Sequence, residues 1–126
     1  MRRYISLVGH GLLGWAICGA IVVVGRQIFS MNLTLWIHAV VAPTAFGFLS
    51  RHHVKAHLGA SPVAMALTMV GLVVGMDALV VAPILERSYE MFRSVLGTWV
   101  PFALIFASTY CVTAAARSRA GTPRTE

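Results

Sequence analysis

Four apolar runs, separated by short polar segments, dominate the chain. They cover residues 5–25, 33–50, 62–85 and 95–116, and a polar C-terminal tail follows at residues 117–126. An α-helix needs about 20 apolar residues to cross about 30 Å of hydrocarbon, so each run is long enough for one crossing. The pattern therefore predicts an all-α polytopic membrane protein, a four-helix transmembrane bundle that forms one domain over residues 1–126.

The composition indicates that lipid is the main solvent. Of the 126 residues, 58% are hydrophobic and 11% are charged, whereas a soluble domain carries about 25% charge. The formal net charge of +6 does not indicate a nucleic-acid partner, because the basic residues fall between the apolar runs. The first run resembles a signal peptide but is long for one, so we expect it to be retained as a span. The predicted partner is the lipid bilayer.

The basic residues are distributed unequally between the two sides of the predicted bundle. Seven lie on the side of the two termini and three on the other, namely Arg2, Arg3, Arg51, Lys55, Arg117, Arg119 and Arg124 against Arg26, Arg87 and Arg93. Cytoplasmic segments of membrane proteins carry the excess of Lys and Arg. This predicts a multi-pass protein of the cell inner membrane with both termini cytoplasmic.

The third apolar run carries small residues at helical spacing: Gly71, Gly75, Ala78 and Ala82. Such a stripe permits close approach of two helix backbones, within the chain or between copies. A homo-oligomer or a larger membrane complex is therefore expected. A ligand lying against the exposed backbone is the alternative.

Three prolines, Pro43, Pro83 and Pro101, lie inside or near the ends of the predicted spans. Each lacks an N–H and frees the carbonyl four residues earlier, so we expect local kinks. In lipid a freed carbonyl needs a partner from a side chain, water or a ligand. The kinks therefore indicate either a site or a bend that improves packing.

Polar residues of three runs fall at similar depths in the outer half of the predicted bundle. His38 lies roughly 8 Å and Asp77 roughly 12 Å from the outer ends of their helices, and Thr98 and Trp99 are in the outer part of the last run. An ionisable residue inside a membrane is a functional candidate by default, and His38 is the best partner for Asp77. The pair could bind and release a proton. Alternatively, it is a neutral hydrogen bond that holds the helices in register.

A second polar cluster is predicted at inner depth, from His10, Thr109 and Tyr110. Hydrogen bonds between helices account for all three. Two axial histidines of one haem must lie at one level, and His10 and His38 fall in opposite halves of the bilayer. This difference in depth disfavours a haem held by both histidines, and the cofactor stays unknown.

No motif in the chain indicates catalysis or a metal site. His52, His53 and His57 follow the second run in a basic segment without nearby Cys, Asp or Glu, which favours a solvated loop near anionic headgroups over metal binding. Cys18 and Cys111 fall at different depths of the predicted bundle, so a disulfide between them is not expected. A nucleophile with its base and a Gly-rich phosphate loop are both missing, so no catalytic residue is assigned and an enzyme is the less favoured class.

Three segments carry a resemblance to known proteins: DAL at residues 77–79, ILERSYEMF at 84–92 and GTWVPF at 97–102. Together with His38-Ala39 and Ala42-Pro43, they resemble small bacterial four-span membrane proteins of unknown function. The resemblance implies topology and location only. In size and span number the chain is also similar to small multidrug-resistance transporters, which are dimers with an acid in the first helix. Here the first run has His10 and no acid, which argues against drug export.

The preferred interpretation is a self-associating inner-membrane protein whose outer-half site around His38 and Asp77 binds a proton, a small cation or a small solute. Proton-coupled transport is the mechanism that such a site suggests. A non-catalytic structural or assembly subunit is the second hypothesis. A haem- or quinone-binding electron-transfer subunit is the third.

Overall fold

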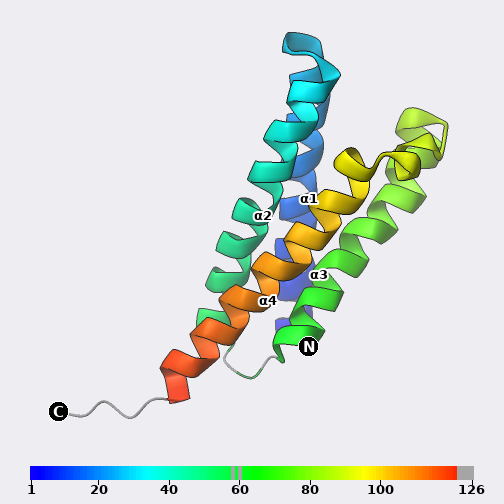
Figure 1. The fold of residues 1–126 in the computed structure, drawn as a ribbon. Coiled ribbons are helices and arrows are strands. Elements are labelled where there is room, and N and C mark those ends of the chain that lie inside the picture. Colours follow the sequence, from blue (N-terminus) through cyan, green and yellow to red (C-terminus); the bar gives the residue numbers. More distant parts are fainter. Residues whose placement is uncertain (58, 60, 122–126) are drawn as a thin grey trace.

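The computed structural model describes residues 1–57, 59 and 61–121, and no strand occurs among them. Figure 1 shows the helical elements along the chain. Their order is α1 (Arg2–Ile28), α2 (Met31–Ala56), α3 (Pro62–Met76), the π-helix η1 (Asp77–Glu86), the 3-10 helix η2 (Glu90–Arg93), the π-helix η3 (Val95–Trp99) and α4 (Val100–Gly121). α3 continues directly into η1, and η3 continues directly into α4.

Within the described part of the chain, four helical stretches are long and apolar enough to cross a membrane: Arg2–Ile28, Met31–Ala56, Pro62–Glu86 and Val95–Gly121. The prediction of an all-helical chain with four membrane-length apolar helices is therefore confirmed.

The helices are longer than the apolar runs that predicted them. α2 continues to Ala56, whereas the sequence pattern predicted an end at residue 50 and a loop beyond it. α4 and η3 together extend to Gly121, so the predicted polar tail is helical up to that residue, and residues 122–126 lie outside the described part. A helix of 27 residues is about 40 Å long, which matches the hydrocarbon core together with the headgroup layers. Polar side chains can therefore lie at headgroup depth while the backbone keeps its helical hydrogen bonds.

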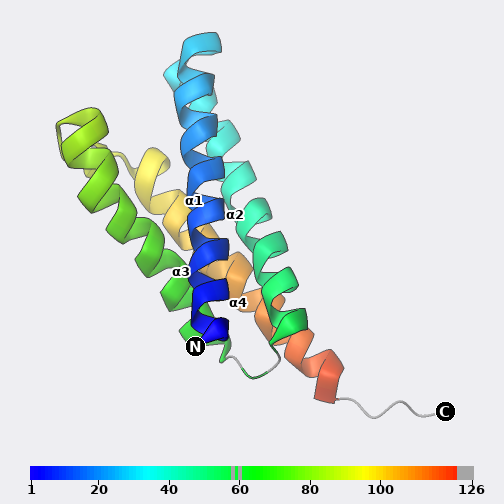
Figure 2. The same ribbon diagram turned by 180° about the vertical axis from the view of Figure 1, so that it is seen from behind.

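The helices form a bundle in which α2 packs against α1 and α4, and α3 packs against α4. α1 and α3 touch over a shorter stretch. We call the end that holds the N terminus of α1 and the C terminus of α4 the basic end, and the opposite end the distal end. Figures 1 and 2 show that the α1–α2 pair and the η1–η3 region splay apart at the distal end.

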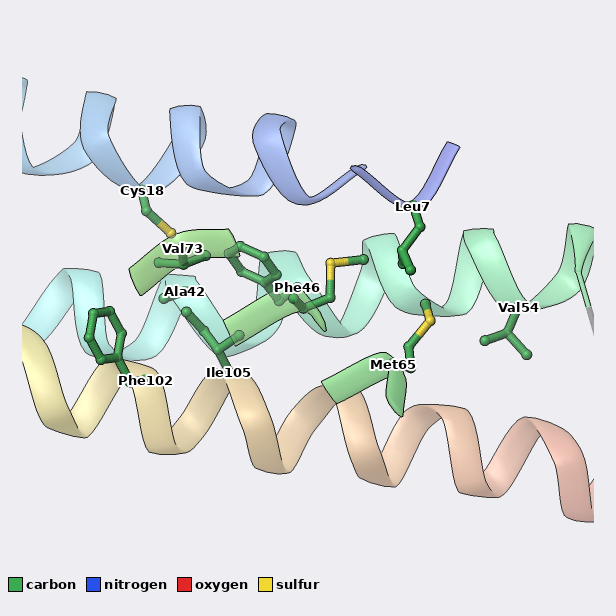
Figure 3. Close-up of a cluster of buried hydrophobic side chains, with 10 residues drawn as sticks. Leu7, Cys18, Ala42, Phe46, Val54, Met65, Val73, Phe102 and Ile105 are labelled. Atoms are coloured by element: carbon green, nitrogen blue, oxygen red, sulfur yellow. The ribbon is translucent and has the colours of Figure 1, made fainter. Parts of the chain in front are cut away.

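Phe46 is the centre of the packed interior (Figure 3). Its side chain is fully buried, and it fills the space in front of Gly14 on α1. A Cβ on Gly14 would lie only 2.6 Å from Cζ of Phe46. Around it are buried side chains of α2, α3 and α4, among them Ala42, Met65 and Ile105. Because lipid is as apolar as these side chains, such close packing is what holds membrane helices together.

The small residues of the third span do not all face the interior. Ala82 is fully buried, whereas Gly71 is exposed and Gly75 is half-buried. No described atom outside the local helix lies within 4 Å of the positions where Cβ atoms on Gly71 and Gly75 would stand. The predicted packing stripe is therefore only partly used within the chain.

Two of the three prolines lie in or next to the π-helical segments. Pro83 is inside η1, and Pro101 is the second residue of α4, directly after η3. Pro43 lies inside the continuous α2. A proline cannot donate to the carbonyl four residues earlier, and the wider turns of a π-helix are one way to accommodate this loss.

Candidate functional site

A pocket of about 550 Å³ lies at the distal end, where the helices splay apart. All four membrane-length helices of the described chain contribute to its lining, as do residues of the connection between η1 and η3. Its volume is within the range of about 300 to 1,000 Å³ that is common for small-molecule sites. Another pocket of about 360 Å³, between α1 and α2, is lined mainly by apolar side chains and offers little polar surface.

Asp77 lies on the wall of the distal pocket, at the start of η1. Its Oδ1 accepts a hydrogen bond of 2.9 Å from the indole Nε1 of Trp15 on α1. The carboxyl group is half-buried, and the bond joins α1 to η1 at the wall of the pocket. Trp15 therefore positions the carboxyl group and also presents an aromatic surface to the same space.

His38 of α2 lines the same pocket. Its Nδ1 is buried and has no hydrogen-bond partner among the described residues. The structure thus brings His38 and Asp77 to one pocket, while the hydrogen-bond partner that it gives to Asp77 is Trp15. A buried nitrogen that lacks a partner loses about 1 to 3 kcal/mol relative to a satisfied one, so a ligand or water bound there is favoured.

Thr98 and Trp99 are neighbours in η3 but have different surroundings. Thr98 is 2% exposed, lines the pocket, and donates from Oγ1 to the Met91 carbonyl at 2.6 Å. Trp99 is 54% exposed, and its Nε1 donates to the Phe92 carbonyl at 2.8 Å. Thr98 therefore belongs to the pocket wall, and Trp99 joins η3 to η2 at the surface of the protein.

The mouth of the pocket is charged. Arg26 at the end of α1 and Glu86 at the end of η1 form an ion pair of 2.9 Å, and Glu90 lines the pocket beside them. Both paired side chains are about two-fifths exposed, at 40% and 41%. Asp77, Glu86 and Glu90 are three of the four acids in the whole chain. Three carboxylates against one guanidinium leave the lining with a formal charge of −2 when His38 is neutral.

The other predicted cluster does not form, because its three residues have different surroundings. Nδ1 of His10 donates to the Ser6 carbonyl at 2.7 Å, near the rings of His52 and His53. Thr109 accepts a 3.3 Å hydrogen bond from Ser50 in the interface of α2 and α4. Tyr110 is exposed and stacks on Phe106.

Besides Glu86 and Glu90, sequence reasoning missed the pocket-lining side chains of α1, among them Trp15 and Arg26. A signal for them exists, because Trp15, Cys18, Val22 and Arg26 recur at steps of three or four residues and share one face of α1. All four line the pocket.

Within residues 1–57, 59 and 61–121, no three His, Cys, Asp or Glu side chains are arranged to hold a metal ion. No family model, curated protein or solved structure matches this chain.

Proposed function

We propose that the chain is a multi-pass protein of a bacterial inner membrane with both termini in the cytoplasm. The support is the placement of seven Lys and Arg residues on the side of the termini against three on the other side. In this orientation the distal pocket lies in the outer half of the bilayer.

We infer that the distal pocket binds a small apolar cation, such as an organic amine. The observation that carries this proposal is that three of the four acids line one pocket, in a protein whose formal net charge is +6. The rest of the wall includes Val73, Phe102 and Ile105, which suit an apolar body. The face of an indole ring attracts a cation, so the Trp15 ring in the wall adds to the selectivity.

Asp77 is the group that would exchange a proton for the cation. It is half-buried in the span, whereas Glu86 and Glu90 are exposed at the mouth. A net charge is expensive away from water, so the exchange of one proton for one cation keeps the charge of the pocket constant. His38 also lines the pocket, and its buried Nδ1, which has no partner among the described residues, is a second atom that can hold a proton.

A structural role is the second candidate, and the hydrogen bond from Trp15 to Asp77 favours it. In that case Asp77 serves only to join α1 to η1. Asparagine also has an Oδ1 acceptor for the indole N–H, so Asp77→Asn separates the two functions.

The experiment uses the purified chain in detergent with Trp36 and Trp99 replaced by Phe, so that Trp15 is the sole tryptophan. Tetraphenylphosphonium is titrated while Trp15 fluorescence and proton release into weakly buffered solution are recorded. We expect saturable quenching with about one proton released per cation bound. In Asp77→Asn, proton release is lost and the affinity falls at least about tenfold, the size of one interaction between partly buried charges.

Arg93→Gln is the matched control, because Arg93 is an exposed charge of the distal end that does not line the pocket. Its binding should equal that of the parent protein. Equal binding by the Asp77→Asn protein, or no saturable quenching in any variant, would overturn the cation site. If the parent and the Asp77→Asn proteins also remain folded, either of these two results supports the structural role of Asp77.

We also propose that the protein self-associates through the face of α3 that carries Gly71 and Gly75. The support is the open space in front of both glycines, which lets the backbone of a second copy approach closely.

A further inference from the structure

Four imidazole rings lie in a row at the basic end of the bundle, in the order His52, His10, His53 and His57. The ring centroids of His52 and His10 are 5.4 Å apart, those of His10 and His53 are 5.6 Å apart, and those of His53 and His57 are 4.9 Å apart. The sequence pattern predicted a solvated loop for three of these residues. Instead, α2 continues to Ala56 and carries His53 into the interior, where it is fully buried.

Hydrogen bonding leaves His53 with an unused donor. Nδ1 of His10 lies 2.7 Å from the Ser6 carbonyl, and because a carbonyl only accepts, this nitrogen donates. The Ser6 hydroxyl lies 3.2 Å from Nδ1 of His53 and can donate to it. The hydrogen of His53 is then on Nε2, which is buried and has no partner in the described part of the chain. A buried N–H of this kind favours an acceptor.

The basic end also lacks an acidic partner in the described chain. Arg3 is close enough to His53 to interact with it electrostatically. The guanidinium Nη1 of Arg3 also lies near Gly59, 3.4 Å from where a Cβ on that residue would stand. The three described acids lie at the distal end. The one ion pair among the described residues joins Arg26 to Glu86 there, and Glu126 lies outside the described residues.

Two helices begin at the basic end without a side-chain cap from the described residues, α1 at Arg2 and α3 at Pro62. The first backbone N–H groups of a helix have no partner inside the helix, and its N terminus carries a partial positive charge. Both features favour an anion. They add to the charge of Arg3 and the free N–H of His53.

We propose that Arg3, His53 and His57 bind the phosphate group of an anionic lipid headgroup at the basic end. The guanidinium of Arg3, Nε2–H of His53 and a ring N–H of His57 donate to phosphate oxygens, once the half-buried His57 ring has turned to admit them. Lipid is the expected source because the helices are long enough to reach headgroup depth. Next to Arg3, Tyr4 and Ile5 are 69% and 68% exposed, which suits contact with an acyl chain.

The test measures binding of phosphatidylglycerol and of phosphatidylcholine with identical acyl chains to the full chain in detergent, by native mass spectrometry. We expect phosphatidylglycerol to bind at least about fivefold more tightly. Arg3→Gln should weaken that binding about fivefold, the effect of one basic residue near an anionic headgroup. His57→Gln should weaken it by a similar factor. His53→Gln tests whether Nε2–H of His53 is needed for this binding. Arg3→Lys should retain most of the affinity for phosphatidylglycerol, because it keeps the positive charge.

Arg119→Gln is the control, because it removes one positive charge at the same end on an exposed turn of α4. We expect this substitution to change the affinity for phosphatidylglycerol less than twofold. If Arg119→Gln weakens binding as much as Arg3→Gln, the attraction is diffuse and the site is refuted. Inorganic phosphate at constant ionic strength forms a second arm, and full competition by it would show a site for soluble phosphate in place of lipid.

Discussion

Gly14 determines how closely α1 approaches α2, because the Phe46 ring occupies the space that a side chain would need. A Cβ at this position would meet three ring carbons of Phe46 at 2.6 to 2.9 Å. We predict that Gly14→Ala destabilises the folded protein by about 1 to 3 kcal/mol, the usual effect of overfilling a packed interior. Reversible unfolding in detergent mixtures measures the change in the free energy of unfolding.

Gly9→Ala is the matched substitution for this prediction. Gly9 is on the same helix, is exposed, and has no described atom outside its own helix within 4 Å of a Cβ position. Because alanine has the higher helix propensity, we expect the free energy of unfolding of the Gly9→Ala protein to rise by up to about 1 kcal/mol. Equal destabilisation by both substitutions would show that the contact with Phe46 is not responsible, since the gain in helix propensity from Gly to Ala acts in the opposite direction.

The residues of the candidate site could be predicted from sequence only in part. The depths of His38 and Asp77 followed from the fixed rise of a helix, and both residues line the distal pocket. The hydrogen bond from Trp15 could not be predicted in this way. It depends on the rotation of α1 about its axis, which packing contacts such as that of Gly14 with Phe46 determine.

At the scale of elements, hydropathy predicted where helices exist better than where they end. The polar residues 51–56 have no apolar pattern, yet α2 continues through them, because a helix that leaves the hydrocarbon needs no apolar side chains. The π-helical turns of η1 and η3 were not predicted either. The prolines indicated irregular backbone at Pro83 and Pro101, but several local geometries accommodate a missing N–H.

The open face of α3 leads to a prediction about association. We expect the double substitution Gly71→Leu and Gly75→Leu to shift the protein towards monomers, because the bulky side chains prevent close approach of a second backbone. Folding should be retained, since no described atom outside the local helix lies within 4 Å of either Cβ position. Sedimentation in detergent measures the monomer fraction.

Gly9→Leu provides the comparison, because it places the same side chain at an open position on a different helix. It should leave the monomer fraction unchanged. If the α3 double variant associates like the parent protein, self-association does not use this face.

At the scale of the whole molecule, charge is separated along the bundle. The three described acids line the distal pocket and are matched in number by Arg26, Arg87 and Arg93 on the same side, while Arg2, Arg3, Arg51 and Lys55 are near the basic end. If the basic end is cytoplasmic, green fluorescent protein should fluoresce when it is fused to either terminus. Alkaline phosphatase should be active when it is inserted in the connection after Arg87 and inactive when it is fused to either terminus. Fluorescent and phosphatase reporters that assign the two termini to opposite sides would contradict the proposed topology.

The position of Asp77 inside the bundle has an electrical consequence. If the distal end faces outward, the carboxyl group lies roughly 12 Å below the outer end of a helix that is long enough to cross about 30 Å of hydrocarbon. A cation that reaches it from outside has therefore passed through about two-fifths of the voltage drop across the bilayer. The proton that the cation displaces leaves through the same fraction in the opposite direction, so the exchange moves no net charge. The occupancy of the pocket should therefore follow the pH and the cation concentration outside, and not the membrane potential.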